Sequence, residues 1–136
     1  FGWAWGRSGW LRSYRGESET AIEHFRRALR LDPNVSSRAN SFAGIGSAHF
    51  NAGRYGATVQ WLRKAQREQP GLSWANRSLS VSYARLGNRL KAHESLEALR
   101  RFCPDLTVGQ VVAAVPFQPD FLDRLGNGLS ELGLPA

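Results

Sequence analysis

The sequence predicts an all-α protein built from repeated helix pairs, and three observations carry this prediction. Ala21, Phe25 and Ala28 share one apolar stripe on a 3.6-residue helix, and Pro33 ends that helix. The same pattern returns as Thr58, Leu62, Ala65 and Pro70, and as Ala92, Leu96, Leu99 and Pro104. No stretch shows the alternation of a β-strand. Because one amphipathic helix cannot bury its stripe alone, we expect each repeated unit to be covered by its neighbours.

Glycine and proline predict where the helices end. A first helix over 2–15 ends at Gly16, and a second helix, with Ser18 as its expected N-cap, ends before Pro33. Further helices are expected over about 37–52, 55–69, 72–86 and 90–102, with Gly53 and Gly87 as helix-ending residues. Glycine turns thus join the first helix to the second, the third to the fourth and the fifth to the sixth.

After Pro104 the repeated spacing stops. Thr107 can cap a short helix through Ala114, residues 115–117 are expected to be extended, and Pro119 begins a last helix to about Leu132. A repeat array needs a terminal element with one apolar and one polar side. The sequence therefore predicts a repeat region over 1–104 and two capping helices over 105–136.

The repeated residues resemble the tetratricopeptide repeat family, whose signature combines a Trp and a Gly on one helix with Ala, Phe and Pro on the next. The matching residues of the first unit are Trp5, Gly9, Ala21, Phe25, Ala28 and Pro33. The resemblance implies a right-handed α-solenoid of three repeats, over about 2–35, 37–71 and 72–104. It also implies a concave groove, lined by the first helix of each repeat, that binds other proteins.

The tail resembles the ending found after tetratricopeptide repeats in bacterial class III adenylate/guanylate cyclases. The shared segments are Pro104-Asp105-Leu106-Thr107-Val108, Pro116-Phe117, Phe121-Leu122-Asp123-Arg124-Leu125, Gly128-Leu129 and Gly133-Leu134-Pro135. This resemblance implies a parent protein with a catalytic or DNA-binding domain upstream. The absence of an initial Met also leads us to expect that the chain is a fragment of a longer protein.

The net charge of +7 is unevenly placed, since residues 1–101 hold 17 Lys and Arg against 7 acids and the last 35 residues hold 1 against 4. A basic body can attract nucleic acid or acidic peptides. However, 16 of the 18 basic residues are Arg scattered over exposed helical positions, which favours an ordinary solvated surface. Nucleic-acid binding therefore stays the less favoured alternative.

No residues form a catalytic or metal-binding pattern. His24, His49 and His93 belong to different helix pairs and have no ligand partners at metal-site spacing. We expect packing or surface roles for these histidines and a buried structural thiol for Cys103. No cofactor, metal or enzymatic activity is expected of this segment. The longest apolar run, 111–117, is too short to cross a membrane, and the lone cysteine fits a reducing, cytoplasmic location.

The first helix of each predicted repeat supplies the candidate groove contacts. Trp10 and Tyr14 share one face with Trp3, and aromatic residues beside polar ones suit peptide recognition. The six candidate contacts are Trp10, Tyr14, Asn51, Trp74, Arg77 and Arg85. The aromatic stripe could equally contact a preceding repeat or the folded-back tail.

The sequence thus favours a non-catalytic scaffold or regulatory module that binds a peptide or a protein domain, with its own upstream domain as one candidate partner. The parent is expected to be a bacterial signalling protein such as an adenylate cyclase. Two alternatives stay open: a basic nucleic-acid-binding module, and a self-association module that forms a homodimer through the aromatic first helix, in either case as part of a transcriptional regulator.

Overall fold

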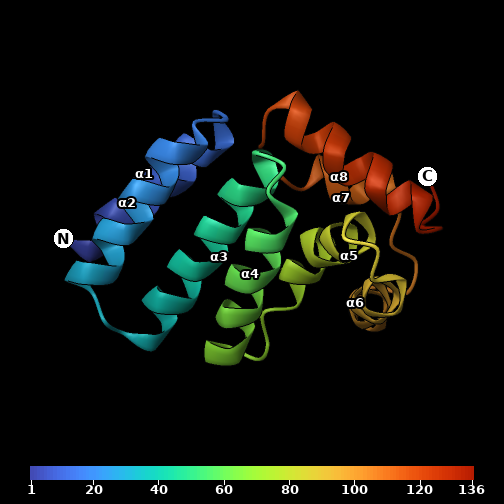
Figure 1. The fold of residues 1–136 in the computed structure, drawn as a ribbon, viewed down its shortest axis with the longest axis horizontal. Helices are drawn as coiled ribbons and strands as arrows, with labels where there is room; N and C mark the ends of the chain where they lie inside the picture. The colour runs from blue at the N-terminus through green and yellow to red at the C-terminus, as the bar shows by residue number, and fades with distance from the viewer.

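A computed structural model describes all residues, 1–136, and contains eight α-helices and no strand, which confirms the all-α prediction (Figure 1). The helices are α1 (Gly2–Tyr14), α2 (Ser18–Leu31), α3 (Val35–Asn51), α4 (Tyr55–Glu68), α5 (Asn76–Arg85), α6 (Arg89–Phe102), α7 (Val108–Ala113) and α8 (Pro119–Glu131). A short 3-10 turn, η1 (Ser73–Ala75), leads into α5.

The first six helices form three pairs, α1 with α2, α3 with α4, and α5 with α6, and the pairs stack side by side along the chain (Figure 1). The same turn closes each pair, because Gly16, Gly53 and Gly87 all have a positive φ of 77 to 83°. Only glycine adopts that conformation without strain. The glycine signals therefore predicted the three hairpins, and the helix ends lie within about two residues of the expected positions, except that α5 begins four residues late, after η1.

The interior has two parts. A small core joins α1 and α2 to α3 around the fully buried Phe25, with Ile22 and Ile45 beside it. A larger core runs from α3 through α6 and into the tail. The tail is thus part of the main core.

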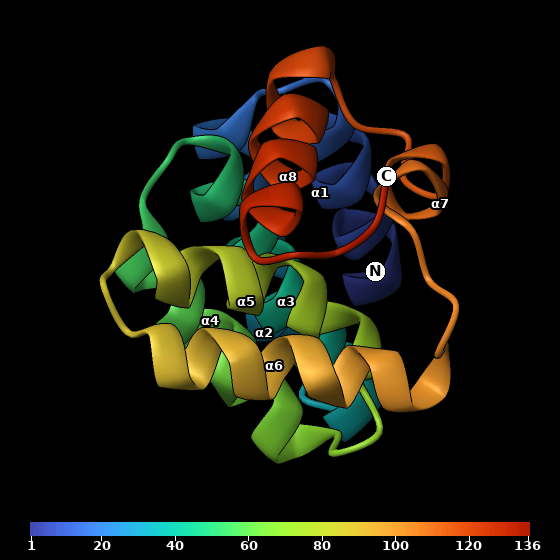
Figure 2. The same cartoon turned by 90° about the vertical axis from the view of Figure 1, so that its right-hand side faces the viewer.

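Helix α8 lies against α3 and α5, and Figure 2 shows it beside α5 while α6 faces outward. Val81 of α5 packs directly under Gly128, and the Phe121 ring meets the Phe50 ring at 5.1 Å. The family resemblance implies a groove lined by the first helix of each repeat, but Phe50 of α3 and Val81 of α5 are fully buried. An open groove along these residues is therefore wrong, because α8 occupies this part of it.

Two further local expectations were wrong. Ser18 is the first residue of α2, and the N-cap position belongs to Glu17, without a side-chain cap. Cys103 is exposed, because it follows the end of α6 where the chain leaves the core. Helix α3 also begins at Val35, two residues before the expected start, because the Asn34 side chain accepts a hydrogen bond from the Ser36 backbone N–H.

Candidate functional site

One cavity of about 490 Å³ lies where α1, α3, the start of α5 and the tail meet. It falls in the size range of ligand pockets in proteins. The lining residues are Trp10 and Tyr14 of α1, Asn40 and Ser47 of α3, Trp74, Arg77 and Ser78 of η1 and α5, residues 114–117, and Phe121 and Leu125 of α8. Four of the six candidate contacts therefore meet in one place.

Aromatic rings form a continuous row along this pocket. The Trp10 ring lies 6.0 Å from Trp74 and 5.9 Å from Tyr14, measured between centroids. Tyr14 in turn meets Phe117 of the tail edge-on at 4.9 Å, and Phe117 stacks on Phe121. The tail thus completes a wall that α1 begins, and apolar side chains can pack along it.

Hydrogen bonds and packing fix the orientation of the aromatic side chains. The Trp10 indole N–H donates to Asn40 Oδ1 at 3.0 Å, and the Trp10 ring packs edge-on against the buried Phe25 at 5.4 Å. Burial raises the pKa of Tyr14, so its phenol stays a neutral hydroxyl at physiological pH. The pocket wall is therefore preformed, which lowers the entropic cost of binding.

Arg77 is the one charged residue among those that line the pocket. Its Nε donates to the Trp74 carbonyl at 3.1 Å, and its guanidinium carbon lies 5.6 Å from the centre of a Trp74 ring. Burial lowers the pKa of Arg77, yet the group stays charged at physiological pH. No carboxylate of the chain pairs with it.

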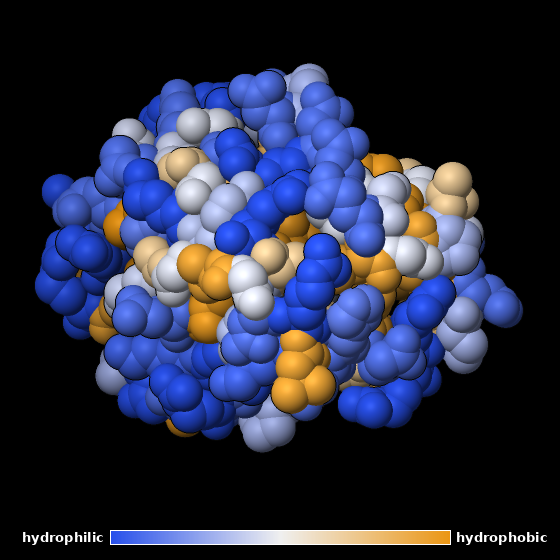
Figure 3. Space-filling model, turned by 45° about the vertical axis from the view of Figure 1, so that its right-hand side comes forward, coloured by the Kyte–Doolittle hydropathy of each residue, from blue (hydrophilic) through white to orange (hydrophobic).

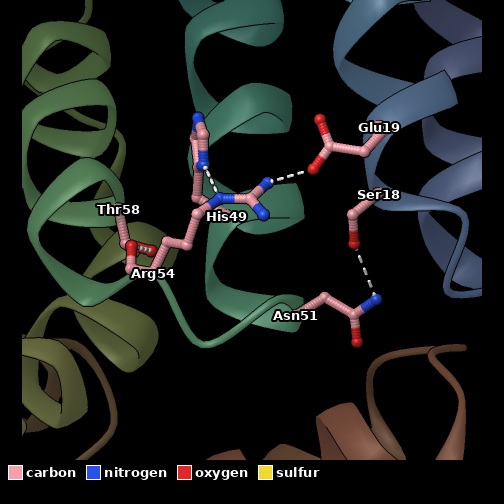
Figure 4. Close-up of polar contacts among 6 residues, drawn as sticks. All are labelled: Ser18, Glu19, His49, Asn51, Arg54 and Thr58. Atoms are coloured by element: carbon pink, nitrogen blue, oxygen red, sulfur yellow. Dashed lines mark hydrogen bonds and ion pairs between the residues drawn. The ribbon is translucent and has the colours of Figure 1, made fainter.

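The other two candidate contacts lie outside this pocket. Asn51 Nδ2 donates to Ser18 Oγ at 3.0 Å and so joins the end of α3 to the start of α2 (Figure 4). Arg85 Nη1 donates to Glu131 Oε2 at 2.8 Å, which links α5 to the end of α8 and raises the pKa of Arg85. Both side chains make contacts within the fold, and their role toward a ligand stays a prediction.

Figure 4 also shows Arg54 between two side chains from neighbouring pairs. Arg54 Nε donates to His49 Nδ1 at 2.8 Å, and its Nη2 donates to Glu19 Oε1 at 2.7 Å. Burial first, then the charges of Arg54 and Arg26, lower the pKa of His49, and Glu19 opposes them. His49 is therefore neutral at neutral pH and accepts the hydrogen bond through Nδ1.

The tail contributes to the pocket, which the sequence offered as the alternative of a folded-back tail against the aromatic stripe, without naming the tail residues involved. Val115, Pro116, Phe117, Phe121 and Leu125 line the cavity, although we expected this segment to cap the end of the array. The Pro116-Phe117 pair was the available signal, because an extended segment that carries an aromatic residue can enter a groove beside it. Periodicity could not reveal this contact, because the tail lies outside the repeated pattern.

Fewer than half of the 18 basic residues pair with an acid. Seven arginines lie within ion-pair distance of a carboxylate, namely Arg12, Arg27, Arg30, Arg38, Arg54, Arg85 and Arg100. Figure 3 shows one face of the molecule, on which hydrophilic residues dominate and hydrophobic ones form small patches between them. This arrangement is typical of a solvated surface, on which single ion pairs contribute little stability.

The histidines and acids do not gather into a metal site, since no group of three or more His, Cys, Asp or Glu side chains is placed to hold an ion. His24 bonds Ser8 Oγ through Nδ1 at 2.8 Å, and His93 is exposed on α6. None of the eight helices combines the length and apolarity that crossing a membrane requires.

Comparison with known proteins supports the repeat assignment. Residues 4–35 match the tetratricopeptide repeat family. The chain is also 33% identical over 89 residues to Superkiller protein 3 of Saccharomyces cerevisiae, a match that covers 65% of this chain and 6% of the yeast protein. The chain thus spans only a small part of the length of this relative.

Tetratricopeptide repeats are in general non-catalytic units that mediate protein–protein interaction. Neither match supports the cyclase resemblance of the tail or a bacterial origin, and both stay predictions. The boundaries of the second and third repeats also stay predictions, since the family match covers the first pair alone. The all-helical architecture and the family match together give this chain the fold of a tetratricopeptide-repeat helical solenoid.

Proposed function

We propose that this chain is a non-catalytic module that binds a segment of a partner protein in the pocket between α1, α5 and the tail. The observation that carries the proposal is the preformed aromatic row of Trp10, Trp74, Tyr14 and Phe117 along a cavity of about 490 Å³. Aromatic side chains in desolvated pockets dominate binding energies at protein interfaces. Helix α8 covers the groove along α5, and this pocket lies beside it with its apolar wall accessible to a partner.

A pocket-filling substitution tests this function without removing core residues. Ala114 and Ala113 are adjacent and exposed, but only Ala114 lines the cavity. Peptides that bind the unmodified chain can be selected from a random phage-displayed library. We expect the Ala114→Trp variant to bind these peptides about tenfold more weakly or worse, because the new indole occupies the space that the peptides would fill. Ala113→Trp, the matched control, should keep the affinity.

Fluorescence polarisation with the selected peptides measures these affinities, and circular dichroism checks that both variants are folded. Equal affinity in all three proteins would place the peptides outside the pocket and contradict the proposal. A library from which the unmodified chain enriches no peptide would contradict it too.

We propose further that the module is the C-terminal regulatory part of a cytoplasmic bacterial signalling protein, such as an adenylate cyclase. The support is the run from Pro104 to Pro135, which resembles the tails of such enzymes. The coding sequence upstream of Phe1 tests this idea. A cyclase domain with its pair of metal-binding aspartates would support it, and further helical repeats alone would contradict it.

A further inference from the structure

We infer that the pocket recognises an acidic side chain, Asp or Glu, next to an apolar residue in the partner segment, with Arg77 as the group that binds the carboxylate. This inference rests on the proposed function and adds the chemistry of the ligand. The residues that line the pocket include one cation, Arg77, and no acid.

Arg77 is one of five half-buried arginines, and three of the other four, Arg12, Arg38 and Arg100, pair with a carboxylate. Arg38, for example, forms a fork to both carboxylate oxygens of Glu68 at 2.7 and 2.8 Å. Arg77 has only the bond from Nε to a backbone carbonyl, so both terminal nitrogens are free to donate. Two parallel N–H groups match a carboxylate, and the partly desolvated site strengthens such a bond.

The position of Arg77 beside Trp74 adds an apolar requirement. The guanidinium lies over the indole, so a carboxylate bound to it would be held at the edge of the aromatic row. The neighbouring residue of the ligand would then face Trp10 and Phe117. The Asn40 side-chain nitrogen, whose amide oxygen is taken by Trp10, is a further donor in the same cavity.

Charge complementarity favours an acidic segment at longer range as well. Residues 1–101 carry 17 basic residues against 7 acids. This excess raises the local concentration of acidic segments and speeds their association. A basic or neutral segment would leave the Arg77 charge without a partner in a partly buried site, which costs binding free energy.

The test repeats the library selection on three forms of the full chain: unmodified, Arg77→Gln and Arg63→Gln. Arg63 is exposed on α4 and away from the pocket, so its substitution removes the same charge elsewhere. We expect the unmodified chain and Arg63→Gln to enrich Asp or Glu beside an apolar residue. Arg77→Gln should keep the apolar preference and lose the acidic one.

A selected peptide and its acid-to-amide analogue then complete a double-mutant cycle. The amide analogue should bind the unmodified chain about 10- to 100-fold more weakly, and it should bind Arg77→Gln as well as the acidic peptide does. Circular dichroism confirms that the variant is folded.

Three outcomes separate the two proposals. Apolar peptides without an acid, blocked by Ala114→Trp, would overturn the carboxylate assignment and leave the proposed function standing. If Arg77→Gln and Arg63→Gln lose the enrichment of acidic peptides to the same extent, general charge attraction would explain the preference. That result would also overturn the assignment of the carboxylate to Arg77. Failure to enrich any peptide would overturn the proposed function together with this inference.

Discussion

The Phe25 ring lies between two glycines on neighbouring helices, and this contact brings the first pair close to the second. A Cβ at Gly9 would stand 2.9 Å from the ring, and one at Gly44 would overlap it. The Phe25 ring therefore fills the space that side chains at Gly9 and Gly44 would otherwise take. Gly9 and Phe25 are among the residues that match the repeat signature, so the sequence already contained two partners of this contact.

Substitution of Gly44 tests this contact. Gly44→Ala should lower the free energy of unfolding by about 1–3 kcal/mol, because the new methyl group overpacks the core against Phe25. Gly56→Ala on α4 is the control, since a Cβ there meets nothing within 4 Å. Its stability should be unchanged or raised by up to about 1 kcal/mol. Urea denaturation measures both, and equal effects would contradict the packing described for Phe25.

His49 predicts a dependence of stability on pH. Its pKa in the fold lies below the unfolded value of 6.5, so the unfolded chain takes up the proton first as the pH falls. The contribution of His49 to stability is thus present above pH 6.5 and is lost as the pH falls toward its lowered value in the fold. Protonation at Nδ1 also breaks the hydrogen bond from Arg54.

His49→Gln removes this titration. The difference in unfolding free energy between the unmodified chain and the variant should shrink between about pH 7.5 and about pH 5.5. Denaturant titrations at several pH values measure it. A difference that is constant over this range would show that His49 titrates alike in the folded and unfolded chain.

At the scale of elements, helix α8 is held in the groove by a close approach to α5. Gly128 has no side chain where Val81 packs, and the bond from Arg85 to Glu131 fastens the far end of the same helix. The end of the tail also closes on α7, where the Val108 backbone N–H donates to the Pro135 carbonyl at 2.7 Å. The tail is thus attached at several points.

Gly128→Ala should cost about 1–3 kcal/mol of stability, because its methyl group overlaps Val81. Gly126→Ala on the same helix is the matched control, since its Cβ would make ordinary contacts of 3.5 and 3.7 Å with Val108 and Val112. Adding Val81→Ala should recover part of the Gly128→Ala cost, as thermal unfolding would show. Additive costs in the double variant would place α8 away from Val81.

The sequence predicted the helices more reliably than their packing. Gly16, Gly53 and Gly87 each require a positive φ, and Pro33 and Pro70 stop the helices before them, so local chemistry alone set these ends. The 3-10 turn before α5 was not predicted, because the choice between 3-10 and α geometry depends on how the connection packs.

At the scale of the whole molecule, the repeat pattern predicted the stack of pairs, and it could not predict where the tail lies. Each pair contacts its neighbours in the order of the chain, whereas α8 contacts α3 and α5, which are far from it in sequence. For the same reason the sequence placed Trp10, Trp74 and Arg77 in one groove, but it gave a contact with the folded-back tail only as an alternative and did not name Phe117. The pocket exists because a non-repeated segment enters a repeated scaffold.

The central claim is that α8 occupies the groove along α5, and an engineered disulfide tests it most directly. A Cβ on Gly128 would stand 3.1 Å from the Val81 Cβ, close to the separation of about 3.5–4.5 Å that a disulfide requires. Cys103 is exposed and can first be replaced by Ser, which leaves the engineered pair as the chain's cysteines. We predict that Val81→Cys with Gly128→Cys forms an intramolecular disulfide under mild oxidation.

The control pair is Val81→Cys with Gly126→Cys, because Gly126 faces α7. Mass spectrometry under non-reducing conditions, with counting of free thiols, measures both proteins. A disulfide in the first pair and free thiols in the second would place α8 in the groove and the pocket beside it. Free thiols in both, or equal oxidation of both, would contradict the account.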